Sequence, residues 1–350
     1  MEKLKCHVQT YPWGKKGMNS EVARIYASGH ADVAIDDNTS YAELWMGTHP
    51  DGPCYLQRSQ KKLSQHIAEC DDDHCKVSTE KHLPFIMKLM SIEHSLSIQV
   101  HPTKDQAARL NDSDPSHYPD RNHKPELAYA LTRFELLCGF RPPDQICANF
   151  EAFPELKHLM GEDTSQAFQI LVKAGISEEC ETLKAALAVC FKKFMKYAVD
   201  VDEVKLSLDS LLVKLANGVR GSLTEETVAV IQKMSRDFPG DIGCFTPLLL
   251  NHLILLPGEC CYYAAQELHA YLSGECIECV SCSNNTIRAA CTSKYVDINT
   301  LCQVLNYRMT DPSYYIICAK ELKNFPHVHV FDPDCDDFTL HEIKVRSVFH

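Results

Sequence analysis

The sequence has no long apolar run and no excess of positive charge. None of its segments stays apolar for the length of a membrane-spanning helix, and Met1-Glu2-Lys3-Leu4-Lys5 lacks the apolar region of a signal peptide. The formal net charge of −12 disfavours binding to nucleic-acid backbones and to anionic membrane surfaces. We therefore expect a cytosolic protein whose partners are neither nucleic acids nor membranes.

Internal repeats are also missing, and the one low-complexity tract is the acidic run Asp71-Asp72-Asp73, which we interpret as a solvated loop. Cysteine is abundant, with 18 residues in a chain of 350. These cysteines are scattered through apolar segments, a pattern typical of reduced, buried thiols and not of a disulfide framework. The length predicts two or three domains.

Residue patterns divide the chain into a strand-like, turn-rich part up to about Pro143, a helical part up to about Pro239, and a second strand-like part. Apolar residues of the middle part recur at helical spacing: Leu183, Leu187, Phe191 and Phe194; Val204, Leu208, Leu211 and Leu215; Val228, Ile231 and Met234. We predict helices that end near Gly175, Gly218 and Gly221, and a capping box at Ser222-Leu223-Thr224-Glu225. Strands are predicted at Leu248-Leu249-Leu250 and at residues 252–256, before the turn Pro257-Gly258.

The segment Leu96-Ser97-Ile98-Gln99-Val100-His101 alternates polar and apolar residues with a period of two. On a strand, Ser97, Gln99 and His101 would therefore share one face. An amide oxygen and an imidazole two residues apart can bind one cation, and Glu126 with a further histidine would complete a set suited to Zn²⁺. Taken alone, this spacing more commonly reflects polar groups whose hydrogen bonds are satisfied.

Many short motifs resemble those of the type I phosphomannose isomerase family. They are Tyr11-Pro12-Trp13-Gly14-Lys15, Ser20-Glu21-Val22-Ala23-Arg24, Ala42-Glu43-Leu44-Trp45-Met46-Gly47-Thr48-His49-Pro50, Leu83-Pro84-Phe85-Ile86-Met87-Lys88, the strand with Gln99 and His101, Asn122-His123-Lys124-Pro125-Glu126, Leu137-Cys138-Gly139-Phe140-Arg141-Pro142, Leu256-Pro257-Gly258-Glu259, His269-Ala270-Tyr271-Leu272-Ser273-Gly274 and Ile287-Arg288-Ala289. So many matching motifs in one order are not expected by chance.

The resemblance implies a mixed β and α fold: a cupin-type jelly-roll β-barrel catalytic domain, an inserted all-α domain and a truncated C-terminal cupin-like β domain. The expected boundaries are 1–143 plus 240–310 for the discontinuous catalytic domain, 144–239 for the helical insertion and 311–350 for the C-terminal domain. Family members continue for several strands beyond this point, so we expect an incomplete C-terminal domain with an open sheet edge.

The resemblance also implies Zn²⁺ as cofactor and a small-molecule sugar phosphate as partner of a monomeric enzyme. The implied reaction is the reversible isomerisation of mannose 6-phosphate and fructose 6-phosphate through an enediol, which supplies mannose for GDP-mannose and glycosylation. The implied metal ligands are Gln99, His101, Glu126 and His269, and the implied phosphate-binding residues are Ser97, Lys88 and Lys294. Each lysine, taken singly, is better explained as a surface charge.

The proton carrier is left open between two residues. Lys124 is two residues from Glu126 and could act if zinc and Arg288 disfavour its charged form, and Glu278 is an alternative carboxylate base. Arg288 would stabilise developing negative charge, and His123 could assist ring opening. In the structural alternative, Lys124 and His123 only orient Glu126, and Glu278 pairs with a lysine.

Four positions depart from the family pattern. Asn284, Ala290 and Ser293 stand where the family normally has Asp, Gly and Pro, and Leu268 stands where it usually has Pro. An amide cannot serve as a base, so these changes keep open a second hypothesis: a catalytically weak or inactive relative that binds metal and sugar phosphate as a sensor or partner protein. A cupin oxygenase is disfavoured, because such an iron site more naturally has several histidines and no glutamine.

Two cysteine groups offer competing metal sites. Cys276, Cys279 and Cys282 are spaced by three, and Cys70 and Cys75 flank His74. The first group lacks a fourth ligand at zinc-knuckle spacing. It also falls where the family resemblance implies a strand, on which thiols three residues apart point to opposite faces. We therefore favour the oxygen and nitrogen ligand set over either group.

Overall fold

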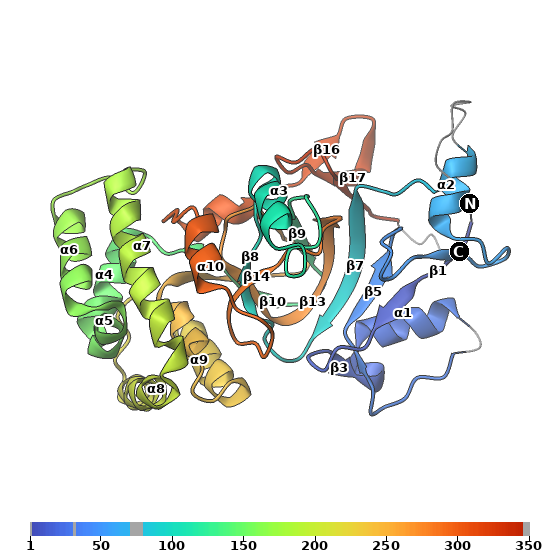
Figure 1. Cartoon of the computed structure of the whole chain (residues 1–350). Helices are drawn as coiled ribbons and strands as arrows, with labels where there is room; N and C mark the ends of the chain where they lie inside the picture. The colour runs from blue at the N-terminus through green and yellow to red at the C-terminus, as the bar shows by residue number, and fades with distance from the viewer. Residues whose placement is uncertain (1, 31–32, 71–79, 346–350) are drawn as a thin grey trace.

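The computed structural model describes residues 2–30, 33–70 and 80–345. The fold is mixed α/β: the helices between residues 143 and 237 gather at one end of the molecule, and a large sheet occupies its centre (Figure 1). Among the described residues, no helix is both long enough and apolar enough to cross a membrane.

The elements follow one another in three groups along the chain. The strands of the first part are β1 (Leu4–Lys5), β2 (His7–Gln9), β3 (Lys15–Lys16), β4 (Ser40–Tyr41), β5 (Glu43–Met46), β6 (Tyr55–Leu56), β7 (Phe85–Ile92), β8 (Ile98–Val100), β9 (Glu126–Ala130) and β10 (Phe134–Phe140), with helices α1 (Glu21–Gly29), α2 (Leu63–Cys70) and α3 (Lys104–Ser113). The middle group is α4 (Pro143–Ala152), α5 (Pro154–Met160), α6 (Glu162–Lys173), α7 (Glu181–Lys196), α8 (Val201–Ala216) and α9 (Glu225–Asp237). The last group is β11 (Leu250–Leu255), β12 (Cys260–Tyr263), β13 (His269–Ser281), β14 (Ile287–Ala290), α10 (Ile298–Val304), β15 (Ile316–Ile317), β16 (Lys320–Leu322), β17 (Phe325–Phe331) and β18 (Leu340–Ile343).

Strand β13 is the centre of the large sheet. From Gly274 onward it pairs with β7 and β9, whereas its first residues pair with β10 and β8. The change of partners falls at Gly274, which has a φ of +103° and at which a Cβ would lie 2.4 Å from the Arg133 carbonyl oxygen. Only glycine fits such a position, so Gly274 allows one strand to serve both parts of the sheet.

The predicted helical pattern of the middle part is confirmed by burial. The apolar positions predicted for α7, α8 and α9 are all buried, and they belong to one large core that also contains Ile98 and Val100 of β8. Gly175 and Gly218 adopt positive φ just after α6 and α8, as expected of helix stops.

Two local predictions are wrong. The N-cap of α9 is Thr224, whose side chain accepts from Thr227 N, and not Ser222. Ser222 instead donates its N–H and hydroxyl to Asn149 Oδ1, so a tertiary contact removes it from the helix start. The run Leu248-Leu249-Leu250 is also not a strand: residues Ile242–Leu248 form a 3₁₀ helix, and β11 begins only at Leu250.

The cysteines of the described residues are free thiols. Cys276 and Cys279 project into different apolar clusters, as expected for residues three apart on a strand, so they do not converge on one metal ion. Cys70 is exposed. Its proposed companions His74 and Cys75, and the acidic run at residues 71–73, lie outside the described residues.

The segment between β17 and β18 packs on the main sheet. Strands β16, β17 and β18 form a separate three-stranded sheet, whereas β15 pairs with β12. Phe331, Phe338 and Leu340 bury their side chains against Leu127 of β9 and Cys279 of β13. Residues 331–340 thereby pack against the two strands that carry Glu126 and His269.

Candidate metal centre and active site

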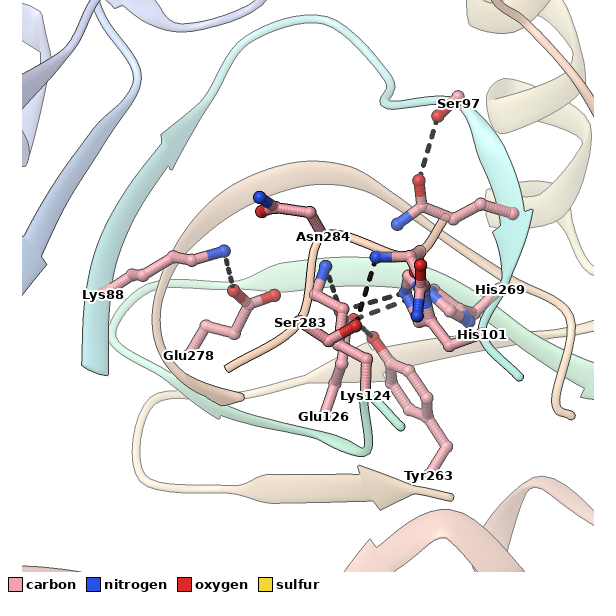
Figure 2. Close-up of polar contacts among 12 residues, drawn as sticks. Lys88, Ser97, His101, Lys124, Glu126, Tyr263, His269, Glu278, Ser283 and Asn284 are labelled. Atoms are coloured by element: carbon pink, nitrogen blue, oxygen red, sulfur yellow. Dashed lines mark hydrogen bonds and ion pairs between the residues drawn. The ribbon is translucent and has the colours of Figure 1, made fainter. Parts of the chain in front are cut away.

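His101, Glu126 and His269 converge on one another at the ends of three strands (Figure 2). Glu126 begins β9, His269 begins β13, and His101 directly follows β8. All three are almost completely buried. His101 Nε2 lies 3.1 Å from Glu126 Oε1, and His269 Nε2 lies 3.5 Å from Glu126 Oε2. These three residues, distant in sequence, meet because β13 pairs with both β8 and β9. In the pairing with β8, His269 stands opposite Gln99.

Backbone carbonyls fix the tautomer of both histidines. His101 Nδ1 lies 2.7 Å from the Asn285 carbonyl oxygen, and His269 Nδ1 lies 2.9 Å from that of Glu267. A carbonyl only accepts, so each Nδ1 carries the proton. Burial lowers the pKa of His101 and lowers that of His269 to about 4, which keeps both rings neutral. Each Nε2 therefore presents a lone pair, and neither has a hydrogen-bond partner.

This arrangement fits a divalent cation. Two buried imidazole lone pairs point toward a buried carboxylate, and such groups repel one another unless a cation lies between them. Burial raises the pKa of Glu126, but the positive charge of Lys124 opposes that effect, and the pKa lies well below its usual value. Two neutral histidines and one carboxylate are a donor set typical of Zn²⁺.

Gln99, the fourth residue of the predicted ligand set, lies on the neighbouring strand. Its backbone pairs with His269 of β13 and with Arg288 of β14, and its side chain lines the same cavity as Glu126. Its Oε1 accepts from the Ser97 hydroxyl at 3.1 Å. Ser97 and Gln99 thus face the cavity while Ile98 and Val100 are buried in the core, as the alternation predicts.

A cavity of about 820 Å³ opens beside His101, Glu126 and His269, which we call the metal cluster because they are the expected metal ligands. Of the residues predicted from sequence, those that line it are Lys88, Ser97, Gln99, Lys124, Glu126, His269, Glu278, Arg288 and Lys294. The cavity is large enough for a sugar phosphate, and its lining places several lysine and arginine side chains near the metal cluster.

Lys88 and Glu278 form a buried ion pair in this cavity, with Lys88 Nζ 2.6 Å from Glu278 Oε2. Burial lowers the pKa of Lys88, but Glu278 and Glu43 outweigh that effect and raise it above its ordinary value. Burial also raises the pKa of Glu278, and Lys88 opposes this shift. Lys88 Nζ further lies 5.4 Å from the centre of the Trp45 ring, within cation–π range.

Lys124 contacts the metal cluster directly, since its Nζ lies 3.1 Å from Glu126 Oε1. Arg288 is half-buried and Lys294 is exposed at the cavity rim. His123 is not part of the cavity lining in the described chain. Its Nε2 lies 2.6 Å from Asp337 Oδ2, in the segment between β17 and β18, and Asp337 also accepts from the Ser281 hydroxyl.

The four departures from the family pattern leave the metal cluster in place. Leu268 is buried in the main core, and His269 beside it reaches Glu126. Asn284 lines the cavity, where its Nδ2 donates to Asp51 Oδ2 at 3.0 Å. Ala290 is buried, and Ser293 lines the cavity.

Sequence reasoning missed three residues of the site. Glu43 and Trp45 both line the cavity, and the Trp45 ring N–H donates to Glu43 Oε2 at 2.5 Å. Their spacing of two inside a recognised motif was a signal that could have been used. Tyr263 donates its hydroxyl to Glu126 Oε2 at 2.7 Å, but nothing in the local sequence predicts this contact.

Comparisons with known proteins agree on one family. Residues 1–143 match the catalytic domain of type I phosphomannose isomerase, and residues 159–250 match its helical insertion domain. Mannose-6-phosphate isomerase of Bos taurus and that of Homo sapiens are each 39% identical over 350 residues, covering 98% of this chain and 81% of the relative. Mannose-6-phosphate isomerase 1 of Arabidopsis thaliana is 36% identical, and the match covers 97% of this chain and 78% of the relative.

Solved structures agree with the sequence matches. A zinc-bound mannose 6-phosphate isomerase superposes with a TM-score of 0.75 at 25% identity, over 97% of this chain and 82% of the other. A mutant phosphomannose isomerase from Salmonella typhimurium gives a TM-score of 0.76 over the same shares. The matches cover nearly the whole chain and include the strands that carry the metal cluster. The chain therefore belongs to the type I phosphomannose isomerase family.

Proposed function

We propose that this protein catalyses the reversible isomerisation of mannose 6-phosphate and fructose 6-phosphate, with Zn²⁺ as cofactor. The observation that carries the proposal is the buried cluster of His101, Glu126 and His269 beside a cation-lined cavity, in a chain 39% identical to mannose-6-phosphate isomerases. Zinc-bound neighbours of similar fold support the choice of metal.

His101, Glu126 and His269 would hold the zinc, with Gln99 as a fourth ligand from the adjacent strand. Bound zinc supplies a Lewis acid that polarises the substrate oxygens. The buried, neutral imidazoles and the ionised carboxylate support these ligand roles. Ser97, Lys88 and Lys294 would bind the phosphate, and all three line the cavity.

Glu278 is the residue that we assign to carbon-bound proton transfer. Its carboxylate would remove the proton from C2 of the open-chain aldose and return it to C1. Burial raises the pKa of Glu278 above its ordinary value, which makes the carboxylate a stronger base for taking the proton from carbon. Lys124 would donate hydrogen bonds to the substrate oxygens, and Arg288 would stabilise negative charge on the enediol.

His123 is assigned a positioning role instead of a part in ring opening. Its contact with Asp337 directs the imidazole toward the C-terminal segment, and the neighbouring Lys124 reaches Glu126. His123 would therefore anchor the loop that presents Lys124.

The large sheet is, in this proposal, a cupin-type jelly roll made from residues 1–143 plus 240–310, interrupted by a helical domain at 144–239 and followed by β structure at 311–350. Its support is the pairing of β10 with β11, which lie on either side of the helical segment in sequence. We also propose a cytosolic monomer that acts on a small sugar phosphate; the net charge of −12 supports the absence of polyanionic partners.

Isomerisation in deuterated water tests the proposal. With mannose 6-phosphate as substrate, we expect NMR to detect fructose 6-phosphate, with deuterium at C1 in those turnovers in which the proton held by Glu278 exchanges with solvent before it is returned. H101A should give neither fructose 6-phosphate nor deuterium incorporation. Sugar-phosphate binding without product or exchange in the wild-type protein would instead select the inactive relative.

A further inference from the structure

Tyr263 contacts two of the three clustered residues at once. Its hydroxyl donates to Glu126 Oε2 at 2.7 Å, and its ring lies 4.4 Å from that of His269 between centroids, at an interplanar angle of 34°. The contact follows from strand register, because Tyr263 of β12 stands directly opposite Glu126 of β9. Figure 2 shows the Tyr263 side chain approaching Glu126.

The position of Tyr263 excludes a direct role in chemistry. It is 2% exposed and does not line the 820 Å³ cavity, so no substrate atom can reach its hydroxyl. Tyr263 contacts Glu126 and His269, and both of these residues line the cavity. Any effect of Tyr263 on the reaction must therefore pass through the carboxylate or through the neighbouring His269 ring.

The two oxygens of Glu126 have different partners. Oε1 lies 3.1 Å from both His101 Nε2 and Lys124 Nζ, whereas Oε2 accepts from Tyr263 and lies 3.5 Å from His269 Nε2. A carboxylate can rotate about its last bond, and a short hydrogen bond to one oxygen fixes that rotation. Tyr263 supplies this bond from the side away from the cavity.

We propose that Tyr263 is a positioning residue that sets metal affinity by fixing the Glu126 carboxylate and the His269 ring. This inference rests on the proposed function, since it assumes that the cluster binds zinc. Hydrogen bonds to metal ligands of this kind typically change metal affinity about 10- to 100-fold when removed. The hydroxyl, and not the ring, should account for most of the effect.

Zinc affinity of the apoprotein, measured by competition with a chromogenic chelator, tests the inference. Y263F keeps the ring and removes only the hydroxyl, and we expect its zinc affinity to fall about 10- to 100-fold. Y118F is the matched control, because Tyr118 is also buried and donates to a carboxylate, Asp297, away from the metal cluster. Its zinc affinity should equal that of the wild type.

A double-mutant cycle with E126Q separates positioning from general damage. If Tyr263 acts through the carboxylate, the loss caused by Y263F should be smaller in the E126Q background than alone. In the cobalt-substituted protein, Y263F should also shift the visible absorption bands that report ligand geometry, and Y118F should not.

Each outcome decides a separate question. Wild-type protein that binds no zinc would contradict the proposed function itself. Wild type that binds zinc, with Y263F binding it equally well, would overturn only the role of Tyr263. Failure of Y263F to fold would overturn it too, because Tyr263 would then control stability instead of metal affinity.

Discussion

Lys88 and Glu278 stand directly opposite each other on β7 and β13, and their charged atoms meet at 2.6 Å inside the cavity. Both side chains are less than one-tenth exposed. A buried ion pair contributes little net stability, but loss of one partner leaves the other charge buried and uncompensated. A substitution of Glu278 should therefore change both the free energy of unfolding and kcat, because Glu278 is also the proposed proton carrier.

E278Q should lower kcat by about 100-fold or more, because an amide cannot accept the proton. It should also lower the free energy of unfolding by about 3 kcal/mol, since Lys88 loses its paired charge. Steady-state kinetics and urea unfolding measure the two effects.

E275Q is the control for this prediction. Glu275 is buried on the same strand and pairs with Lys15 at 3.2 Å, but it does not line the cavity. E275Q should lose stability and keep its kcat. An E278Q protein that keeps wild-type kcat would rule out Glu278 as the proton carrier and return that role to Lys124.

Asp337 should matter for activity although it lies about 200 residues from Lys124 in sequence. Its carboxylate binds the His123 imidazole and accepts a hydrogen bond from the Ser281 hydroxyl. His123 directly precedes Lys124, so this contact orients the backbone that carries Lys124. D337N should lower kcat/KM by about tenfold through misplacement of Lys124 while zinc content stays unchanged. The exposed neighbour Asp336 provides the control D336N. Equal kinetics for D337N and D336N would show that this link has no catalytic role.

The sequence predicts local features of the site better than its assembly. The period of two through Ile98, Gln99 and Val100 places Gln99 on the cavity face because side chains alternate on any strand. In contrast, the pairing of Gln99 with His269 joins residues 170 positions apart. No local pattern specifies such a register, and only the family motifs pointed to His269.

Tertiary contacts explain the local errors. Ser222 and Thr224 are both good N-cap residues, and the choice between them depends on Asn149, which lies 73 positions earlier and binds Ser222. The surroundings of His123 depend on a distant residue in the same way, because Asp337 between β17 and β18 binds its imidazole; its expected part in ring opening stays a prediction. Neither distant partner can be identified from the residues around Ser222 or His123.

Stability should fall in mild acid because of His252, which is away from the metal cluster. Burial, assisted by Arg141 and Arg133, lowers the pKa of His252 to about 4. The unfolded chain therefore binds a proton below about pH 6.5 that the folded chain does not, and stability is lost as the pH falls.

Between pH 7 and pH 5 this single residue should lower the free energy of unfolding by about 2 kcal/mol. H252Q, which cannot titrate, should lose correspondingly less over the same interval when both proteins are unfolded with urea. Equal losses for the two proteins would show that His252 does not carry this pH dependence.

The dependence of turnover on bound zinc tests the central claim most directly. Protein stripped with a chelator is titrated with Zn²⁺ while mannose 6-phosphate conversion is followed in a coupled assay. We predict that activity is absent without metal and rises linearly to a plateau at about one zinc per chain, and that H101A shows no such rise. Full turnover by the stripped protein, or a wild-type protein that binds zinc and remains inactive, would contradict the account.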